Sequence, residues 1–213
     1  MPAGKIREKK KEYFLEIEKR IPKMSIDDLE GRKQLLKLSG LRRGRILDVG
    51  LGDCGCMSFY LAKRGFDVTG IDSSSLAVHK SRKEAAGKKL KGSFQTRRMN
   101  AEKTSFEEES FDAVLSYHSM HDMPNPDKVI REMFRVCRKG GVVAISDLNA
   151  KGRGEYGHEP DEKFLLDVKR QLKKYSKQIR KGKTDINKMF ICEKKQGSSG
   201  PRRGAAYSGS FKK

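Results

Sequence analysis

Residues 45–55 read RILDVGLGDCG. The apolar start of this stretch predicts a buried strand, and the glycines at positions 50, 52 and 55 let the backbone turn sharply into a helix. Asp72 ends the next apolar run, 22 residues after Gly50. A glycine-rich turn between strand and helix, followed by an acid after the second strand, is typical of a crevice that binds an adenosine-containing cofactor.

Strand and helix patterns alternate along the chain after this stretch. Strands are expected at residues 66–72, 93–99, 111–117 and 139–147, and helices at residues 55–65, 76–86 and 129–137. This alternation predicts an α/β fold with a Rossmann-like, doubly wound and mostly parallel sheet that carries helices on both faces. A last strand is expected at 186–195 and is a candidate for an antiparallel direction, and residues 138–141 are expected to form a turn.

Composition divides the chain into three parts. The expected domain covers residues 44–195 and includes an insertion at 149–185. Residues 1–43 are expected to form an N-terminal helical lid or cap. Residues 196–213, with their Gly, Ser and Arg, have too little apolar surface to order themselves, so we expect a flexible basic tail.

Apolar spacing also predicts helices in the flanks and in the insertion. One covers residues 5–21, and a second begins at a capping arrangement of Ser25 and Asp28 and ends at Gly40. After a glycine-rich loop, one apolar face predicts a long basic helix that extends from Phe164 to Ile179. We expect these flanking helices to close over the cofactor crevice.

The net charge of the chain is +20, and it is unevenly distributed. Residues 151–213 hold 18 basic and 7 acidic side chains, whereas residues 46–150 hold 16 and 14. Basic flanks of this kind would support salt-sensitive binding to RNA, DNA or an acidic surface. A charge that only keeps the protein soluble explains them equally well, so both interpretations stay open.

Neither a membrane protein nor a classically secreted one is expected. No run approaches the roughly 18 apolar residues that span a bilayer, and no apolar stretch follows the basic start of the chain. The cysteines are too few for a disulfide scaffold and do not have the spacing of metal ligands; they are Cys54, Cys56, Cys137 and Cys192. We therefore expect a cytoplasmic protein without a metal site.

Two classes of cofactor are compatible with the glycine-rich turn: a nicotinamide or flavin dinucleotide, and S-adenosylmethionine. A pyrophosphate needs only hydrogen-bond donors and a positive helix end, whereas the amino acid part of S-adenosylmethionine also carries an ammonium group. Asp48, two residues before the first glycine, is an acid that suits such an ammonium.

Several stretches together resemble the class I S-adenosylmethionine-dependent methyltransferases over residues 35–148. ILDVGLGDCG resembles their motif I, Asp72 in VTGIDSS resembles the ribose-binding acid, and Asn100-Ala101 in RRMNAEK resembles the acid-Ala pair beside the adenine. SFDAVLSYHSMHDM and REMFRVCRKGGVVAISD resemble the fourth strand, the helix and the Gly-Gly turn of the small-molecule subgroup. Cys54 departs from the pattern where a third glycine is frequent, and Asn100 departs where Asp is usual.

The resemblance implies a seven-stranded methyltransferase fold and S-adenosylmethionine as the cofactor. In particular, it implies that Asp48 orients the motif I loop and the ammonium and that Asp72 binds the ribose. The residues expected to bind the cofactor are Asp48, Gly50, Gly52, Asp53, Gly55, Asp72, Ser73, Asn100, Ala101 and Tyr117.

Methyl transfer requires an aligned nucleophile and a base only where that nucleophile carries a proton. We expect Tyr117, His118 and His121 to be catalytic, with His158 as a further candidate base. The Asn/Asp-Pro-Pro-aromatic motif and the Pro-Cys of nucleic-acid methyltransferases are absent after the fourth strand, which favours a small-molecule acceptor. The alternatives are an RNA or protein methyltransferase that binds through its basic flanks, and an NAD(P)-binding oxidoreductase or a non-catalytic nucleotide-binding module.

Overall fold

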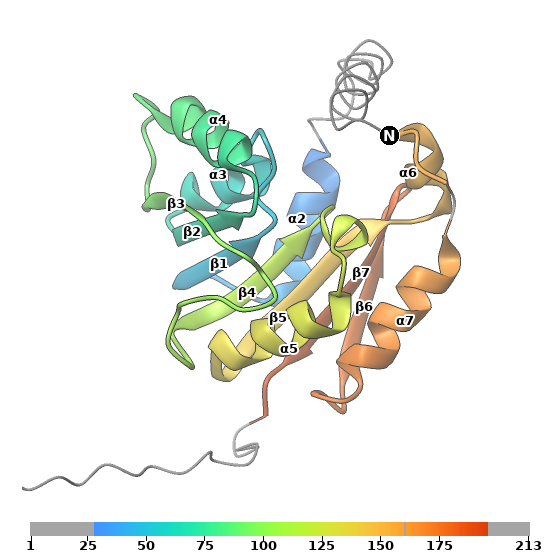
Figure 1. Cartoon of the computed structure of the whole chain (residues 1–213). Coiled ribbons are helices and arrows are strands. Elements are labelled where there is room, and N and C mark those ends of the chain that lie inside the picture. The colour runs from blue at the N-terminus through green and yellow to red at the C-terminus, as the bar shows by residue number, and fades with distance from the viewer. Residues whose placement is uncertain (1–27, 160, 196–213) are drawn as a thin grey trace, which may run out of the picture.

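The computed structural model describes residues 28–159 and 161–195, which are arranged around one twisted sheet (Figure 1). The sheet has the strand order β3-β2-β1-β4-β5-β7-β6. Its strands are β1 (Arg45–Val49), β2 (Asp67–Asp72), β3 (Phe94–Arg98), β4 (Phe111–Tyr117), β5 (Cys137–Leu148), β6 (Ile179–Lys183) and β7 (Asn187–Glu193). The five strands from β3 to β5 in this order are parallel, whereas β7 is antiparallel to both β5 and β6. The prediction of a doubly wound, mostly parallel, seven-stranded sheet is confirmed.

The central strands are apolar because both faces of the sheet are covered. The larger helices are α2 (Leu29–Ser39), α3 (Cys56–Ala62), α4 (Ser75–Ala85), α5 (Pro126–Val136) and α7 (Glu162–Leu172). One core cluster joins α5 and α7 to the sheet and includes the buried Ile130 and Leu172. The other joins α2 and α3 to the opposite face and includes the buried Leu35 and Leu61. Helices α2, α3, α5 and α7 therefore pack on the two faces of the sheet and hold its strands in place.

The start of α2 differs from its prediction. The side chain of Asp28, rather than that of Ser25, is the N-cap, and it accepts a hydrogen bond of 2.9 Å from the amide of Gly31. The helix ends as expected at Gly40, whose left-handed φ of 70° suits a residue without a side chain. Ser25, the helix predicted over residues 5–21 and the tail at 196–213 lie outside the described residues.

Two predictions for the insertion are wrong. The predicted glycine-rich loop contains a short helix, α6 (Ala150–Glu155), which begins because the Asn149 side chain accepts a bond of 2.9 Å from the amide of Gly152. The long basic helix ends at Leu172 instead of Ile179. Ile179 pairs with Cys192 in the β6–β7 ladder, so its apolar side chain belongs to the sheet and not to the helix.

The turn predicted at 138–141 lies inside a strand. Strand β5 begins at Cys137, directly after α5, and therefore includes the Gly-Gly pair. The register of the β4–β5 pairing shifts between Phe111 and Ala113, which accommodates these residues. The last predicted strand is confirmed as β7, and it runs antiparallel to β5.

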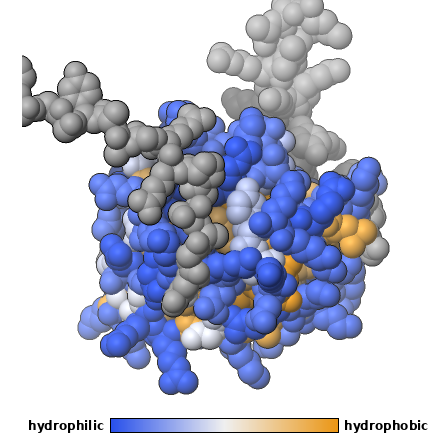
Figure 2. Space-filling view, turned by 90° about the horizontal axis from the view of Figure 1, so that it is seen from below, coloured by the Kyte–Doolittle hydropathy of each residue, from blue (hydrophilic) through white to orange (hydrophobic). Residues whose placement is uncertain are grey.

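The face of the molecule that is seen from below carries little continuous apolar area (Figure 2). On the face seen in Figure 2, hydrophilic side chains dominate the described surface, and hydrophobic residues form small separate spots. Within residues 28–159 and 161–195, none of the helices combines the length with the apolar character that a bilayer span requires.

Candidate functional site

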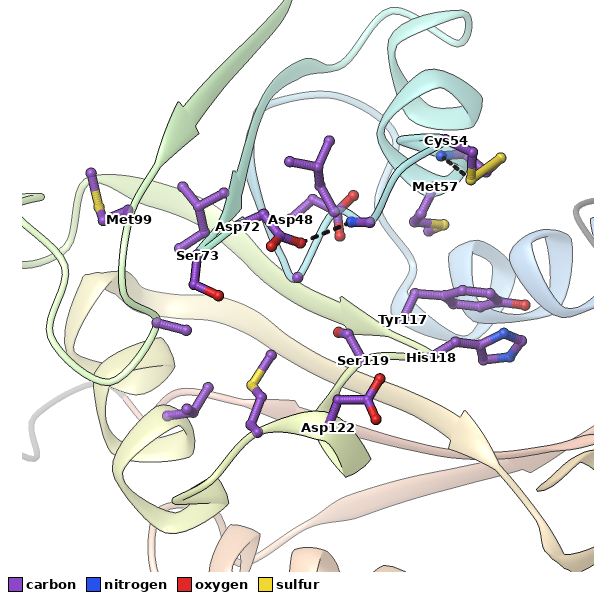
Figure 3. A pocket seen from close by; sticks show the side chains of 18 of the residues that line it. Asp48, Cys54, Met57, Asp72, Ser73, Met99, Tyr117, His118, Ser119 and Asp122 are labelled. Carbon is purple, nitrogen blue, oxygen red and sulfur yellow. Dashed lines mark hydrogen bonds between the residues drawn. A yellow bond between two sulfur atoms is a disulfide. The ribbon is translucent and has the colours of Figure 1, made fainter. Parts of the chain in front are cut away.

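A cavity of about 620 Å³ lies at the carboxyl ends of β1, β2, β3 and β4. This is the edge of a parallel sheet at which ligands are bound in folds of this type. In Figure 3, Met99, Ser73 and Asp72 lie toward one end of the cavity, and Tyr117 and His118 lie at the other. We call the first the β2–β3 end and the second the Tyr117–His118 end.

The glycine-rich turn forms one wall of the cavity. Gly50 has a φ of 77°, and a Cβ added there would meet the Ser119 side chain at 2.5 Å. Gly52 has a φ of 64°, and a Cβ there would meet no atom within 4 Å. Gly50 is therefore required for the packing of the turn, whereas Gly52 leaves open space in which a ligand can approach the backbone.

Asp72 connects the end of β2 to this turn. Its carboxylate accepts one hydrogen bond of 3.1 Å from the amide of Gly52 and another of 2.9 Å from the amide of Ser74. The N-cap of α4 is Ser74 itself, whose hydroxyl accepts from the amide of Ala77. Asp72 lines the cavity, and its two oxygens retain lone pairs that can accept from the hydroxyl groups of a ligand.

Asp48 is a buried acid at the floor of the cavity. It is only 1% exposed, and it accepts a hydrogen bond of 2.6 Å from the hydroxyl of Ser58. Burial raises the pKa of this carboxyl to about 6, although the bond from Ser58 opposes the shift. A buried carboxylate with a single side-chain donor is costly by itself, and a cationic ligand group beside it would offset that cost.

We expect Asp48→Asn to stabilise the ligand-free protein at neutral pH. The raised pKa of Asp48 stabilises the folded wild type at a pH below the ordinary value of 3.8, and this stabilisation is lost as the pH rises through about 6. Relative to the wild type, the free energy of unfolding of Asp48→Asn should therefore rise by about 2–3 kcal/mol between pH 4 and pH 7.

Urea unfolding at several pH values measures this change. Asp112→Asn is a matched control, because hydrogen bonds from Arg45 and Arg138, acting against burial, lower the pKa of Asp112 and give the opposite sign. A pH-independent difference between Asp48→Asn and the wild type would contradict the assignment of a buried, ionisable Asp48.

The β2–β3 end is shaped by a short polar turn. The side chain of Asn100 accepts a bond of 2.8 Å from the amide of Glu102, and Met99 and Ala101 supply apolar surface beside it. Ser73 also lines the cavity. The structure thus brings the residues predicted at 73, 100 and 101 to the same cavity as Asp72.

Two residues predicted to bind the cofactor point elsewhere. Asp53 forms an ion pair of 2.6 Å with Lys80 and is not among the residues that line the cavity. Gly55 caps α3, and a Cβ there would face Leu51 and Ser81 instead of the cavity.

A polar network forms the Tyr117–His118 end. The Tyr117 hydroxyl and the amide group of Asn187 both donate to the Asp28 carboxylate, and the Asn187 carbonyl oxygen pairs with Nε2 of His118. The rings of Tyr117 and His118 stack with centroids 4.2 Å apart. His118 has a left-handed φ of 53°, which is unusual for a residue with a side chain. The hydrogen-bond network therefore holds the backbone of His118 in a strained conformation.

Burial and the network set the ionisation of these groups. Burial lowers the pKa of His118, so its imidazole is neutral at pH 7. Burial and the bond to Asp28 raise the pKa of Tyr117, so its phenol keeps its proton. Burial alone would raise the pKa of Asp28, but the donors on Tyr117 and Asn187 lower it overall. The carboxylate is thus the single negative charge of this network.

Comparison with known proteins agrees with this geometry. Residues 47–145 match the family described as "Methyltransferase domain". A structure of a SAM-dependent methyltransferase from Aquifex aeolicus superposes with a TM-score of 0.65 and 21% identity, over 84% of this chain and 96% of its own length. The motif I turn and the acid after β2 both lie within residues 47–145. Residues 47–145 therefore match a methyltransferase domain, and the chain has the fold of the class I S-adenosylmethionine-dependent methyltransferases.

Curated relatives match about half of the chain. Phosphatidylethanolamine N-methyltransferase from Cereibacter sphaeroides is 36% identical over 113 residues, which are 53% of this chain and 55% of that protein. Ubiquinone biosynthesis O-methyltransferase from Alkalilimnicola ehrlichii is 34% identical over 113 residues, which are 53% of this chain and 44% of that protein. The chain therefore spans about half the length of the curated relatives it matches.

His121 of the methyltransferase domain lies beside the cavity but is not one of the residues that line it. Its Nδ1 lies 2.6 Å from a carboxylate oxygen of Asp147, and its amide donates to the other oxygen at 3.0 Å. Burial by itself would lower the pKa of His121, but Asp147 raises it overall. His158 packs edge-on against the His121 ring at 4.8 Å. The structure therefore separates His118, which faces the cavity, from the His121–His158 pair.

Several residues of the cavity in the methyltransferase domain were not predicted. Cys54 and Cys56 form a disulfide at its rim, although the number and spacing of the cysteines predict no disulfide scaffold. Asp28 and Arg32 also line the cavity. They come from the start of α2, which lies outside motif I, so no local pattern marks them as neighbours of the cofactor site.

Proposed function

We propose that this protein transfers a methyl group from S-adenosylmethionine to a small molecule that binds at the Tyr117–His118 end of the cavity. The observation that carries the proposal is a single cavity with a glycine cradle and two carboxylates on one side and a polar network with a neutral imidazole on the other. A dinucleotide-binding oxidoreductase has less need of a buried acid such as Asp48 beside the glycine turn.

The residues present suit the cofactor. Asp48 would face its ammonium, the open space at Gly52 would admit the methionine part, and Asp72 would accept from the ribose hydroxyls. Asn100 and Ala101 would border the adenine. When bound, S-adenosylmethionine supplies a methyl group on a cationic sulfur, which needs no further activation by a side chain.

His118 would accept the proton of the acceptor. With Nε2 donating to the Asn187 carbonyl, the lone pair of the neutral ring is on Nδ1. Asp28 and Asn187 would hold the imidazole in this tautomer, with Asp28 3.6 Å from Nε2. Tyr117, which keeps its proton, would position the acceptor and pack against the His118 ring.

The segments over the Tyr117–His118 end would act as a lid. Asp28 and Arg32 belong to the start of α2, and Tyr156 follows α6, with its ring 5.9 Å from that of His118. Together they would exclude water from the acceptor, in keeping with a lid that comes from the N-terminal helices and the 149–185 segment.

The names of the relatives support a small acceptor without fixing its atom. One is named as an N-methyltransferase of phosphatidylethanolamine and the other as an O-methyltransferase of ubiquinone biosynthesis. An RNA or protein acceptor, held by the basic flanks, is the alternative that the experiment below separates.

The test is methyl transfer from radiolabelled S-adenosylmethionine into a cell extract that has been separated by size. We expect label in the fraction of small molecules. Label confined to the RNA or protein fraction would contradict the proposed acceptor class, and parallel assays with phosphatidylethanolamine and with a simple phenol would separate nitrogen from oxygen acceptors.

With an acceptor that carries a proton, His118→Gln should lower kcat about 10²- to 10⁴-fold. Glutamine retains a donor for Asn187 but has no basic nitrogen, so the affinity for S-adenosylhomocysteine should change little. The wild-type kcat should fall at acidic pH as His118 becomes protonated, at a pH below the ordinary pKa of histidine because burial lowers it. A variant that retains the wild-type kcat and its acidic limb would show that His118 is not the base.

A further inference from the structure

We propose that His121, Asp122 and His158 bind a divalent transition-metal ion of the zinc class beside the acceptor end of the cavity. One ligand atom from each of these residues lies within 4.8 Å of the others. Two imidazoles and one carboxylate form a donor set that suits zinc and related ions. The inference concerns a second site and does not depend on the proposed methyl transfer.

The side chain of His121 gives independent support for a metal site. It is only 3% exposed, and its Nε2 has no hydrogen-bond partner among the described residues. The nearest acidic oxygen, on Asp122, is 3.6 Å away and thus beyond hydrogen-bond distance. A buried ring nitrogen without a partner is uncommon, and here it faces the group of potential ligands.

Asp147 gives His121 the form that a metal ligand needs. The buried Asp147 carboxylate accepts from Nδ1 of His121 at 2.6 Å and from its backbone amide at 3.0 Å. With the proton on Nδ1, the lone pair is on Nε2, which faces Asp122 and His158. A carboxylate that orients a histidine in this way is the usual second layer of a metal site.

The three ligand atoms must move closer together when a metal ion binds. Zinc holds nitrogen and oxygen ligands at about 2.0–2.2 Å, so tetrahedral ligand atoms lie about 3.4 Å apart. Asp122 is exposed at the end of the short 3-10 helix Met120–Asp122, and His158 lies in the segment after α6, so both side chains can rotate. Three protein ligands leave one position open, and the ligand Asp122 also lines the cavity.

The charges around the site favour a dication. Asp122 and Asp147 supply two carboxylates, and the nearby Arg153 opposes them in part. Arg153 donates to the carbonyl of Glu159 at 2.7 Å, which holds its guanidinium in place. One arginine against two carboxylates leaves the site negative when both histidines are neutral.

Calorimetric titration of the metal-free, full-length chain with ZnCl₂ tests the proposal. We expect one ion per chain, and we expect His158→Gln and Asp122→Asn each to weaken binding at least about tenfold. Asp147→Asn should weaken it about 10- to 100-fold through the orientation of His121. His79→Gln, which removes an exposed histidine on α4, is the matched control and should bind as the wild type does.

Cobalt(II) absorption separates this site from Cys54 and Cys56 near motif I, whose disulfide would offer two thiolate ligands if it were reduced. A Cys54→Ser/Cys56→Ser protein should still bind one ion, with the visible bands of nitrogen and oxygen ligation and no thiolate charge-transfer band. The proposal is overturned if zinc binding is absent, if it disappears in the Cys54→Ser/Cys56→Ser protein, or if His158→Gln and Asp122→Asn both bind as tightly as His79→Gln. Circular dichroism of each metal-free variant checks that it is folded.

Discussion

Asp72→Ala is expected to lower the affinity for S-adenosylhomocysteine about 10- to 150-fold, which corresponds to about 1.5–3 kcal/mol. The substitution removes the charge-assisted bonds that the carboxylate would form with the ribose hydroxyls. It also removes the acceptor that holds the Gly52 amide at 3.1 Å, so the glycine turn loses its connection to β2. Both effects act on cofactor binding.

Asp53→Ala is the matched control for Asp72→Ala. Asp53 is an acid of the same turn, but it pairs with Lys80 at the surface and does not line the cavity. Its removal should change the affinity less than about twofold, in keeping with the small contribution of exposed ion pairs. Calorimetry with both variants gives the comparison. If Asp72→Ala bound as tightly as Asp53→Ala, Asp72 would be only a residue that caps the turn.

Gly50→Ala is expected to lower the free energy of unfolding by about 2–5 kcal/mol. The left-handed conformation costs a residue with a Cβ about 1–2 kcal/mol, and the contact at 2.5 Å with Ser119 adds about 1–3 kcal/mol of overpacking. Ser119 cannot move aside freely, because its hydroxyl donates to the Val49 carbonyl at 2.9 Å and pairs with the Ser116 hydroxyl. Urea unfolding measures the loss.

Gly52→Ala separates packing from ligand binding. A Cβ at Gly52 meets no atom within 4 Å, so only the backbone strain of about 1–2 kcal/mol should reduce stability. The same Cβ occupies the space through which the cofactor approaches, so the affinity for S-adenosylhomocysteine should fall at least about tenfold. In a Ser119→Gly background, Gly50→Ala should regain most of the overpacking cost. Equal stability losses for the two alanine variants, without such recovery, would contradict the packing argument.

The cofactor side of the site could be predicted because its signals are local. Asp48, Gly50 and Gly52 lie within five residues of one another, and the strand order brings Asp72 beside them, as the rules for parallel sheets require. Asp53 and Gly55 share the same motif, yet neither lines the cavity. A motif thus identifies the turn, but the direction of each side chain depends on how α3 leaves it.

The acceptor side could not be predicted, because it depends on contacts between distant segments. Asp28 and Asn187 are 159 residues apart and meet only when β7 enters the sheet beside α2. The errors in the insertion have a similar cause. Residues 179–183 pair with β7 as strand β6, although their sequence, IRKGK, is mostly polar. Helix α6 forms despite its two glycines, because the Asn149 side chain caps it.

The central claim is that the cavity at the end of β1 binds S-adenosylmethionine in preference to a dinucleotide. Isothermal titration calorimetry of the full-length chain with S-adenosylhomocysteine and, separately, with NAD tests it directly. We expect saturable binding of one S-adenosylhomocysteine per chain and no binding of NAD. Saturable binding of NAD without any binding of S-adenosylhomocysteine would contradict it.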